Sequence, residues 1–126
     1  MSIENNYFHE HYWLKNIEDN KYAFGINRKF FEDNLHPQII YLECDIGDIL
    51  FKTDIFATIE NDKISLEIES PFDHAKLIEF NENIDFDQVL ISPEDIENRL
   101  AIFEYKITIT DYMQMIPLFI GIENSH

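Results

Sequence analysis

The chain has 126 residues, the length of one domain with a single hydrophobic core. It carries 25 acidic residues against 9 basic ones, a net charge of −16, and such a surface repels phosphate backbones and anionic lipid, so neither nucleic acid nor a membrane is an expected partner. The single cysteine, Cys44, excludes an intrachain disulfide and a cysteine-based zinc site.

The N-terminal quarter predicts a polar segment followed by a β-hairpin. Residues 1–10 are polar, and we expect them to be loosely ordered. Residues 12–17 and 22–26 have the pattern of two strands, joined by a turn at residues 18–21 that is rich in turn-forming residues.

The next segment predicts one short helix and two strands. Asn27 is a suitable N-cap for a helix over residues 28–35. Residues 38–43 form a mostly apolar run, which favours a strand buried on both faces or near a barrel seam. Residues 45–48 make a turn, and residues 49–54 contain a short strand and a polar corner.

A second hairpin has the clearest pattern in the chain. Apolar and polar residues alternate on both sides of residues 61–63, the apolar ones being Ile55, Ala57 and Ile59 before and Ile64, Leu66 and Ile68 after. A two-residue loop places Ile59 opposite Ile64 or Leu66, and both registers bury one apolar face; a three-residue loop would oppose Ile59 to Ser65. Lys63 therefore lies at or beside the tip of an exposed hairpin.

The C-terminal third predicts two strands, one helix and an apolar tail. Residues 74–81 form a strand, residues 83–90 are irregular, and residues 92–99 form a short helix that begins at an N-cap serine followed by proline and acids. Residues 101–110 alternate as the closing strand. The tail, residues 111–126, is too apolar to lie free in water, so we expect it to pack on the body of the domain or to contact a partner.

Residues with catalytic or metal-binding potential are few. The three glycines, Gly25, Gly47 and Gly121, are far apart, so the chain has no glycine-rich phosphate loop. His9 and His11 could chelate a metal from one face of a strand, but a chance pair in a flexible N-terminus explains them better. We therefore expect no metal site and no independent catalysis.

Lys63 lies in a frame of spaced residues. Glu60 precedes it by three residues, Gly47-Asp48 lies sixteen residues before it, and Pro71 follows eight residues after it. Three further short motifs accompany this frame: His11-Tyr12-Trp13, Phe24-Gly25-Ile26 and Glu79-Phe80-Asn81. In these features the chain resembles the H protein of the glycine cleavage system, whose Glu-x-x-Lys motif bears lipoic acid in amide linkage on the lysine. The resemblance runs from about residue 11 to about residue 107.

The chain also departs from the pattern of this family. The family's second glycine, ten residues before the lysine, is Thr53 here. The glycine turn after the proline is replaced by residues 73–75, the Glu-Leu-Pro before Gly-Asp by residues 43–45, and the late Gly-Trp-Leu by residues 100–103. Each loss removes a backbone-permissive or tightly packed position, so the chain resembles a divergent member.

The resemblance implies a fold and a modification site. The implied fold is mainly β, a flattened barrel-sandwich of two antiparallel sheets with one or two short helices, formed by residues 1–126 as one lipoyl-carrier-like domain. Lys63 would bear the lipoyl group, Glu60 would help a lipoate-attaching enzyme recognise the site, and Asn61, Asp62 and Ile64 would shape the turn. Biotin is disfavoured, because biotin carriers resemble Met-Lys-Met at the tip.

The resemblance further implies a non-catalytic carrier subunit of glycine catabolism that shuttles an aminomethyl group and reducing equivalents. Its partners would be glycine decarboxylase, aminomethyltransferase, dihydrolipoyl dehydrogenase and the lipoate-attaching enzyme, and it would be a monomer or weak oligomer. The alternative is a paralogue that serves as a lipoyl donor, a redox carrier or an unlipoylated interaction module. With no signal or transit pattern and no apolar run long enough to span a bilayer, we expect a cytoplasmic protein, or an organelle-matrix one if a transit peptide has been removed.

Overall fold

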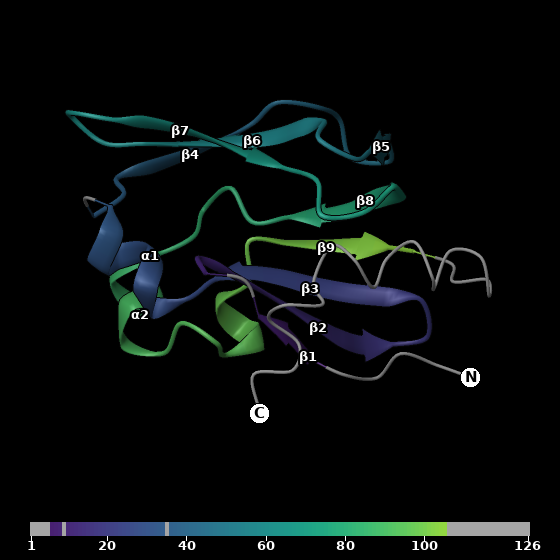
Figure 1. The fold of residues 1–126 in the computed structure, drawn as a ribbon, viewed down its shortest axis with the longest axis horizontal. Helices are drawn as coiled ribbons and strands as arrows, with labels where there is room; N and C mark the ends of the chain where they lie inside the picture. Colours follow the sequence, from purple (N-terminus) through teal and green to yellow (C-terminus); the bar gives the residue numbers. More distant parts are fainter. Residues whose placement is uncertain (1–5, 9, 35, 106–126) are drawn as a thin grey trace.

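Two antiparallel β-sheets face each other in the computed structural model, which describes residues 6–8, 10–34 and 36–105 (Figure 1). The larger sheet has the strand order β1-β2-β3-β9-β8-β5, and the smaller one has the order β4-β6-β7. The strands are β1 (Asn6–Phe8), β2 (Tyr12–Glu18), β3 (Lys21–Ile26), β4 (Ile39–Leu42), β5 (Ile49–Phe51), β6 (Ile55–Glu60), β7 (Ser65–Glu69), β8 (His74–Phe80) and β9 (Ala101–Glu104). This arrangement confirms the predicted fold class.

The N-terminal hairpin forms as predicted, with one addition. Strands β2 and β3 pair in an antiparallel register that sets Trp13 opposite Gly25, and Asn20 adopts a positive φ of 60° in the turn between them. The prediction that residues 1–10 are loosely ordered is wrong for residues 6–8, which pair with β2 as strand β1. The paired residues are close in sequence, Phe8 opposite Trp13, but the polar composition of the segment does not reveal this pairing.

Gly25 makes room for the indole ring of Trp13. A Cβ atom at this position would lie 2.2 Å from an indole carbon, closer than two non-bonded atoms can approach. The fully buried Trp13 donates its indole N–H to the carbonyl of Pro93 at 2.7 Å and to that of Ile26 at 3.2 Å. The pair therefore fixes the segment that contains Pro93 to the larger sheet.

The helices differ from the prediction on the C-terminal side. Helix α1 (Arg28–Asp33) begins at the predicted N-cap, where the Asn27 side chain accepts bonds from the next turn. Helix α2 (Phe86–Ile91) lies in the segment that we predicted to be irregular, and the predicted helix over residues 92–99 is reduced to the 3-10 turn η1 (Ile96–Asn98). Asp85 caps α2, so the stronger helix start is Asp85 rather than Ser92, which ends this helix. No helix in the described part of the chain is long and apolar enough to cross a bilayer.

Strand β4 is also placed differently from the prediction. It pairs only with β6 and lies at the edge of the smaller sheet. Ile39 and Tyr41 are each 44 % exposed, whereas Ile40 is buried, so the prediction of burial on both faces is wrong. An apolar run does not distinguish an edge strand from a central one, because both keep the same residue types.

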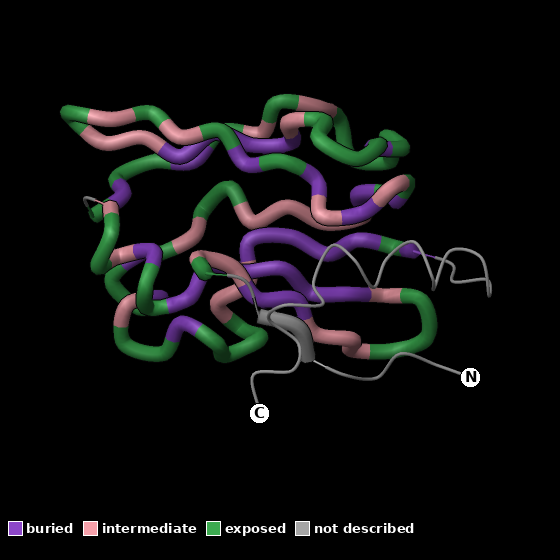
Figure 2. Tube along the Cα trace, in the orientation of Figure 1, coloured by how far each residue is buried: buried purple, intermediate pink, exposed green. Residues whose placement is uncertain are grey.

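Aromatic side chains fill the space between the sheets. Phe24 and Phe103 from the larger sheet meet Phe56 from the smaller one, with ring centroids 5.2–6.1 Å apart. Phe72 stacks on Tyr105 at 4.4 Å. Figure 2 shows that burial is concentrated in the facing strands, while the tip of the β6–β7 hairpin is exposed.

The predicted closing strand is observed as β9 over residues 101–104, whereas residues 106–110 and the apolar tail over residues 111–126 lie outside the described residues.

Candidate functional site

The β6–β7 hairpin has one of the two predicted registers. Ile59 lies opposite Leu66 and Glu60 lies opposite Ser65, which leaves residues 61–64 to form the connection. The inward-facing Ile59 is buried, and Leu66 packs against the core. The apolar alternation thus places Lys63 at the far end of a hairpin whose base is fixed in the sandwich (Figure 1).

The Asn61 side chain holds the backbone of this connection. Its Oδ1 accepts hydrogen bonds from the backbone N–H groups of Lys63 at 2.8 Å and Ile64 at 2.9 Å, and the backbone N–H of Asn61 donates to the Ile64 carbonyl at 3.0 Å. Its Nδ2 donates to the carbonyl of His36 at 3.2 Å. Asparagine is suited to this position, because its short amide can replace a backbone partner within a turn. The root of Lys63 is therefore ordered at both ends.

The Lys63 side chain itself points to solvent. It is exposed, and within the described ranges its ammonium makes no ion pair and no hydrogen bond. Glu60 accepts a hydrogen bond from the Ser65 hydroxyl at 3.2 Å, and Asp62 is exposed beside the lysine. The five residues of the predicted motif, Glu60 to Ile64, thus lie together at one tip, and the lysine among them is exposed.

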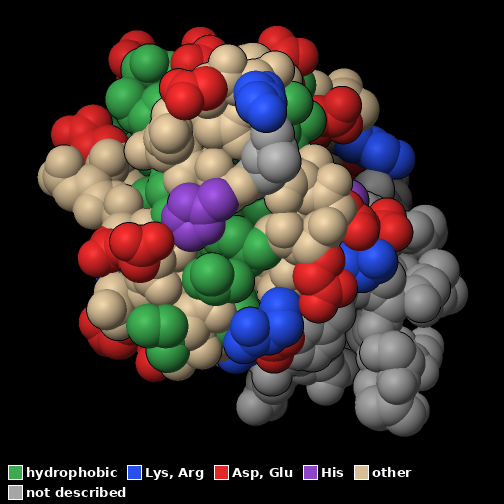
Figure 3. Space-filling model, turned by 90° about the vertical axis from the view of Figure 1, so that its left-hand side faces the viewer, with side chains coloured by type: hydrophobic (Ala, Val, Ile, Leu, Met, Phe, Trp, Pro, Cys, Tyr) green, Lys and Arg blue, Asp and Glu red, His purple; other side chains and the backbone are tan. Residues whose placement is uncertain are grey.

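Two shallow hollows lie beside this tip, and His36 lines both. Each has a volume of about 380 Å³; one lies between residues 36–38 and 83–87, and the other between helix α1 and Leu90. His36 Nε2 lies 3.1 Å from a carboxylate oxygen of Asp87, and its ring packs against Phe31 with centroids 5.7 Å apart. Figure 3 shows this end of the molecule, where exposed apolar side chains lie beside a histidine and carboxylates surround them.

Sequence reasoning did not find this His36 surface. His36 and Asp87 are far apart in the sequence, and helix α2, which presents Asp87, lies in a segment predicted to be irregular. The helical spacing of Phe86, Val89 and Leu90 behind the Asp85 cap was the available signal.

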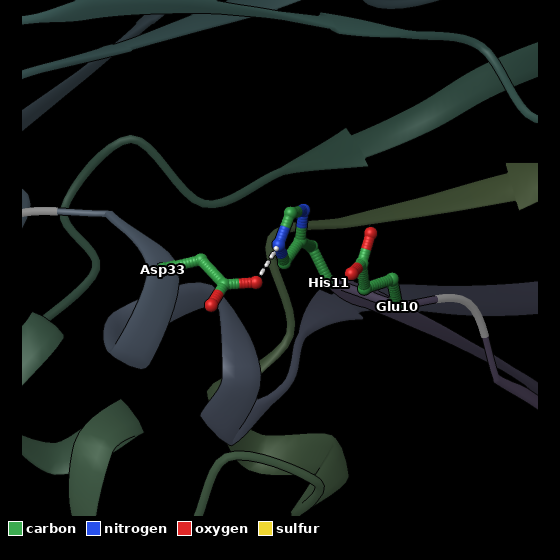
Figure 4. Close-up of side chains that lie close together, drawn as sticks. All are labelled: Glu10, His11 and Asp33. Atoms are coloured by element: carbon green, nitrogen blue, oxygen red, sulfur yellow. Dashed lines mark hydrogen bonds and ion pairs between the residues drawn. The ribbon is translucent and has the colours of Figure 1, made fainter.

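A second polar cluster joins Glu10, His11 and Asp33 (Figure 4). His11 Nε2 lies 2.8 Å from Asp33, and the ammonium of Lys29 lies 3.2 Å from the same carboxylate. The hydrogen bond with His11, and then that with Lys29, lower the pKa of Asp33. Because Lys29 already neutralises this carboxylate, the cluster is explained as a surface ion-pair network. The predicted partner of His11, His9, lies outside the described residues.

Comparison with known proteins identifies the fold. No protein-family model matches the sequence, and no curated protein sequence matches it. A solved glycine cleavage system H protein from Mycobacterium marinum matches the structure with a TM-score of 0.66 at 14% sequence identity, over 93% of this chain and 99% of that chain. The chain therefore has the fold of a glycine cleavage system H protein, with an exposed lysine at the tip of its β6–β7 hairpin.

Proposed function

We propose that this chain is a lipoyl carrier of the glycine cleavage system and that Lys63 is its attachment residue. The observation that carries the proposal is the exposed Lys63 at a hairpin tip, within a fold shared with an H protein. The side chain of Asn61 holds the backbone of this tip in place. A carrier needs little else: a lysine that stands clear of the surface on a rigid root, so that the arm moves while its base does not.

The residues around Lys63 fit an amide-linked arm. The ammonium makes no ion pair within the described part of the chain, so acylation breaks no described contact. The backbone bonds to Asn61 use only main-chain groups of Lys63 and Ile64, so they persist after modification. When attached, the lipoyl group supplies a disulfide–dithiol couple that carries an aminomethyl group and reducing equivalents. The protein itself would contribute positioning and partner recognition, with no catalytic residue of its own.

The proposed partners are glycine decarboxylase, aminomethyltransferase, dihydrolipoyl dehydrogenase and a lipoate-attaching enzyme, in the cytoplasm or an organelle matrix. Acylation removes one positive charge, so the net charge changes from −16 to −17, and Glu60 and Asp62 remain as acidic neighbours of the arm. Such a tip suits active sites with basic entrances. Glu60 would serve the lipoate-attaching enzyme as the recognition residue three positions before the lysine.

A second candidate keeps the fold without the glycine cleavage role. Thr53 takes the place of a family glycine and adopts a positive φ of 74°, a backbone conformation that suits glycine better than threonine. This divergence favours a paralogue that acts as a lipoyl donor, a redox carrier or an unmodified interaction module.

Mass analysis of the protein from its native host separates these candidates. We expect a lipoyl-sized increment on intact protein, and peptide mapping should place it on Lys63. Lys63→Arg should abolish the labelling, whereas Lys52→Arg, which changes another exposed lysine in a turn, should leave it intact. An unmodified Lys63 in cells that lipoylate other proteins would favour the interaction module, and labelling that persists in Lys63→Arg would refute the assignment.

A further inference from the structure

The sheet edges of this protein differ in how they are protected against pairing with another chain. At β5, the Phe51 N–H donates to the Asp54 carboxylate at 2.8 Å, and the Phe51 carbonyl accepts from the Asp54 N–H at 3.0 Å. Both backbone groups of Phe51 are therefore occupied within the chain. Because β5 has only three residues and its last one is bonded to this turn, little of the edge is left for an added strand to bind.

Strand β7, one edge of the smaller sheet, is protected by charge. Its exposed side chains are Ser65, Glu67 and Glu69, so two carboxylates project from five residues. Charged side chains on an edge strand are a common way to discourage strand addition, because the incoming strand would have to pack against them.

Strand β4, the opposite edge of that sheet, has neither kind of protection. Its four residues, Ile39–Leu42, include no charge and no proline, and no strand of the described chain lies on its outer side. The Glu43 N–H donates across to the Phe56 carbonyl, so alternation turns the backbone N–H and C=O groups of Leu42 and Ile40 toward the free edge. The side chains of Ile39 and Tyr41 are each 44 % exposed on one face.

The charges around β4 indicate what could pair with it. Glu60, on β6, lies opposite Ile39, Glu67 lies two strands away from Tyr41, on β7, and Glu43 directly follows β4. A second copy of this chain would bring the same carboxylates together and would add another net charge of −16. An extended segment with basic and apolar residues would instead match both the carboxylates and the exposed pair Ile39 and Tyr41.

We propose that the free edge of β4 binds a basic, extended segment of a partner protein as an added antiparallel or parallel strand. Backbone groups of Ile40 and Leu42 would supply the main-chain hydrogen bonds, and Ile39 and Tyr41 would supply side-chain contact. The added strand would lie two strand spacings, about 10 Å, from β6. Because Ile39 pairs with Glu60, one end of that strand lies beside the hairpin tip that carries Lys63.

This position would orient the hairpin tip toward the protein that contributes the strand. The inference rests on the proposed function only for the identity of this partner, which would be one of the enzymes that act on the Lys63 arm. The edge itself is a property of the fold and can be tested without the arm.

The direct test is amide hydrogen exchange of the full chain with a short peptide of alternating lysine and valine as the probe. We expect the Ile40 and Leu42 amides to exchange at least tenfold more slowly at saturating peptide, because strand addition bonds those N–H groups. A peptide of alternating glutamate and valine should give no protection. Unchanged exchange at β4, or equal protection by both peptides, overturns the inference.

Matched variants extend the test to a protein partner. The double variant Ile39→Lys, Tyr41→Lys places positive charge on the edge and should weaken binding of both the basic peptide and the lipoate-attaching enzyme at least tenfold. Ile91→Lys, at a side chain that is 67 % exposed on α2, is the control and should bind normally.

Two outcomes would contradict the inference. If Lys63 is lipoylated equally well in the double variant, and the enzyme does not slow amide exchange at β4 of the unchanged protein, the edge inference fails while the proposed function stands. If sedimentation shows a dimer that the double variant abolishes, the edge binds a second copy and the partner assignment is wrong.

Discussion

Thr53 is held in a backbone conformation that suits glycine. Its φ of 74° lies in the left-handed region, where a β-branched side chain is unfavourable. We expect Thr53→Gly to stabilise the fold by about 1 kcal/mol, because relief of this strain exceeds the added chain entropy of glycine. Urea unfolding followed by circular dichroism would measure the gain as a higher midpoint at an unchanged slope.

The neighbouring Lys52 provides the control for this measurement. It is exposed like Thr53 but is not among the described residues with a positive φ. Lys52→Gly should therefore lose stability, by up to about 1 kcal/mol, from chain entropy alone. If both glycine variants lose stability, Thr53 is not strained.

Cys44 is a partly buried thiol in acidic surroundings. Burial, and then the charges of Asp48, Asp45 and Asp54, raise the pKa of this thiol. A raised pKa means fewer thiolates at a given pH, so we expect iodoacetamide to alkylate Cys44 several-fold more slowly than an unfolded cysteine at pH 8. The rate should rise only as the pH passes above the usual thiol range. Mass spectrometry in native buffer and in urea gives the comparison, and equal rates would show that the folded environment does not affect the thiol.

At the scale of elements, the hairpin tip depends on one side chain. Asn61→Ala removes the acceptor for the Lys63 and Ile64 N–H groups and the bond to the His36 carbonyl. By analogy with the loss of a helix cap, we expect a cost of about 1–2 kcal/mol. Lipoylation of Lys63 should become slower without being abolished, since the lysine remains but its root is less ordered.

Asp62→Ala is the matched control for the Asn61 variant. Asp62 is exposed at the same tip, and its carboxylate accepts no hydrogen bond within the described part of the chain. Denaturant unfolding and a time course of lipoylation should therefore be close to those of the unchanged protein. A rate for Asn61→Ala equal to that of Asp62→Ala would indicate that the ordered root of Lys63 does not assist modification.

Local sequence patterns predicted the β6–β7 hairpin but missed helix α2. The register of the β6–β7 hairpin follows from local alternation, since a one-residue shift would turn Ile59 and its neighbours outward. Helix α2 was missed because Ser92 and Pro93 form a helix-start pattern that competes with the true cap at Asp85. In the structure Pro93 is buried, and its carbonyl accepts the indole N–H of Trp13, a long-range contact that no local pattern contains.

At the scale of the whole molecule, spacing and resemblance together predicted the two-sheet sandwich, but not its edges or its surface hollows. The motif around Lys63 is contiguous, so it could be predicted. The His36–Asp87 pair and the exposed edge at β4 depend on how distant elements meet. An apolar run such as that of β4 indicates that burial is favourable. Which strand lies at the edge of the sheet depends on the order of all its strands, which the run does not contain.

The net charge of −16 gives a final prediction, in which salt has opposite effects on folding and on partner binding. From roughly 10 to 150 mM sodium chloride the Debye length falls from about 30 Å to about 8 Å. Screening reduces the repulsion among carboxylates, so we expect stability to rise by on the order of 1 kcal/mol, or about 3–6 °C in Tm. Over the same range, binding of the lysine–valine peptide at β4 should weaken, because attraction between opposite charges is screened as well.

A variant with less charge separates these two effects of salt. Asp19→Asn, Glu82→Gln and Glu97→Gln together remove three exposed carboxylates, so the net charge changes from −16 to −13. None of the three lies in β4, β6 or β7. The variant should therefore be more stable at low salt and gain less from added salt, while its peptide binding keeps most of its salt dependence. A Tm that does not respond to salt in either protein would show that the carboxylates are already balanced locally, and the global repulsion argument would then be wrong.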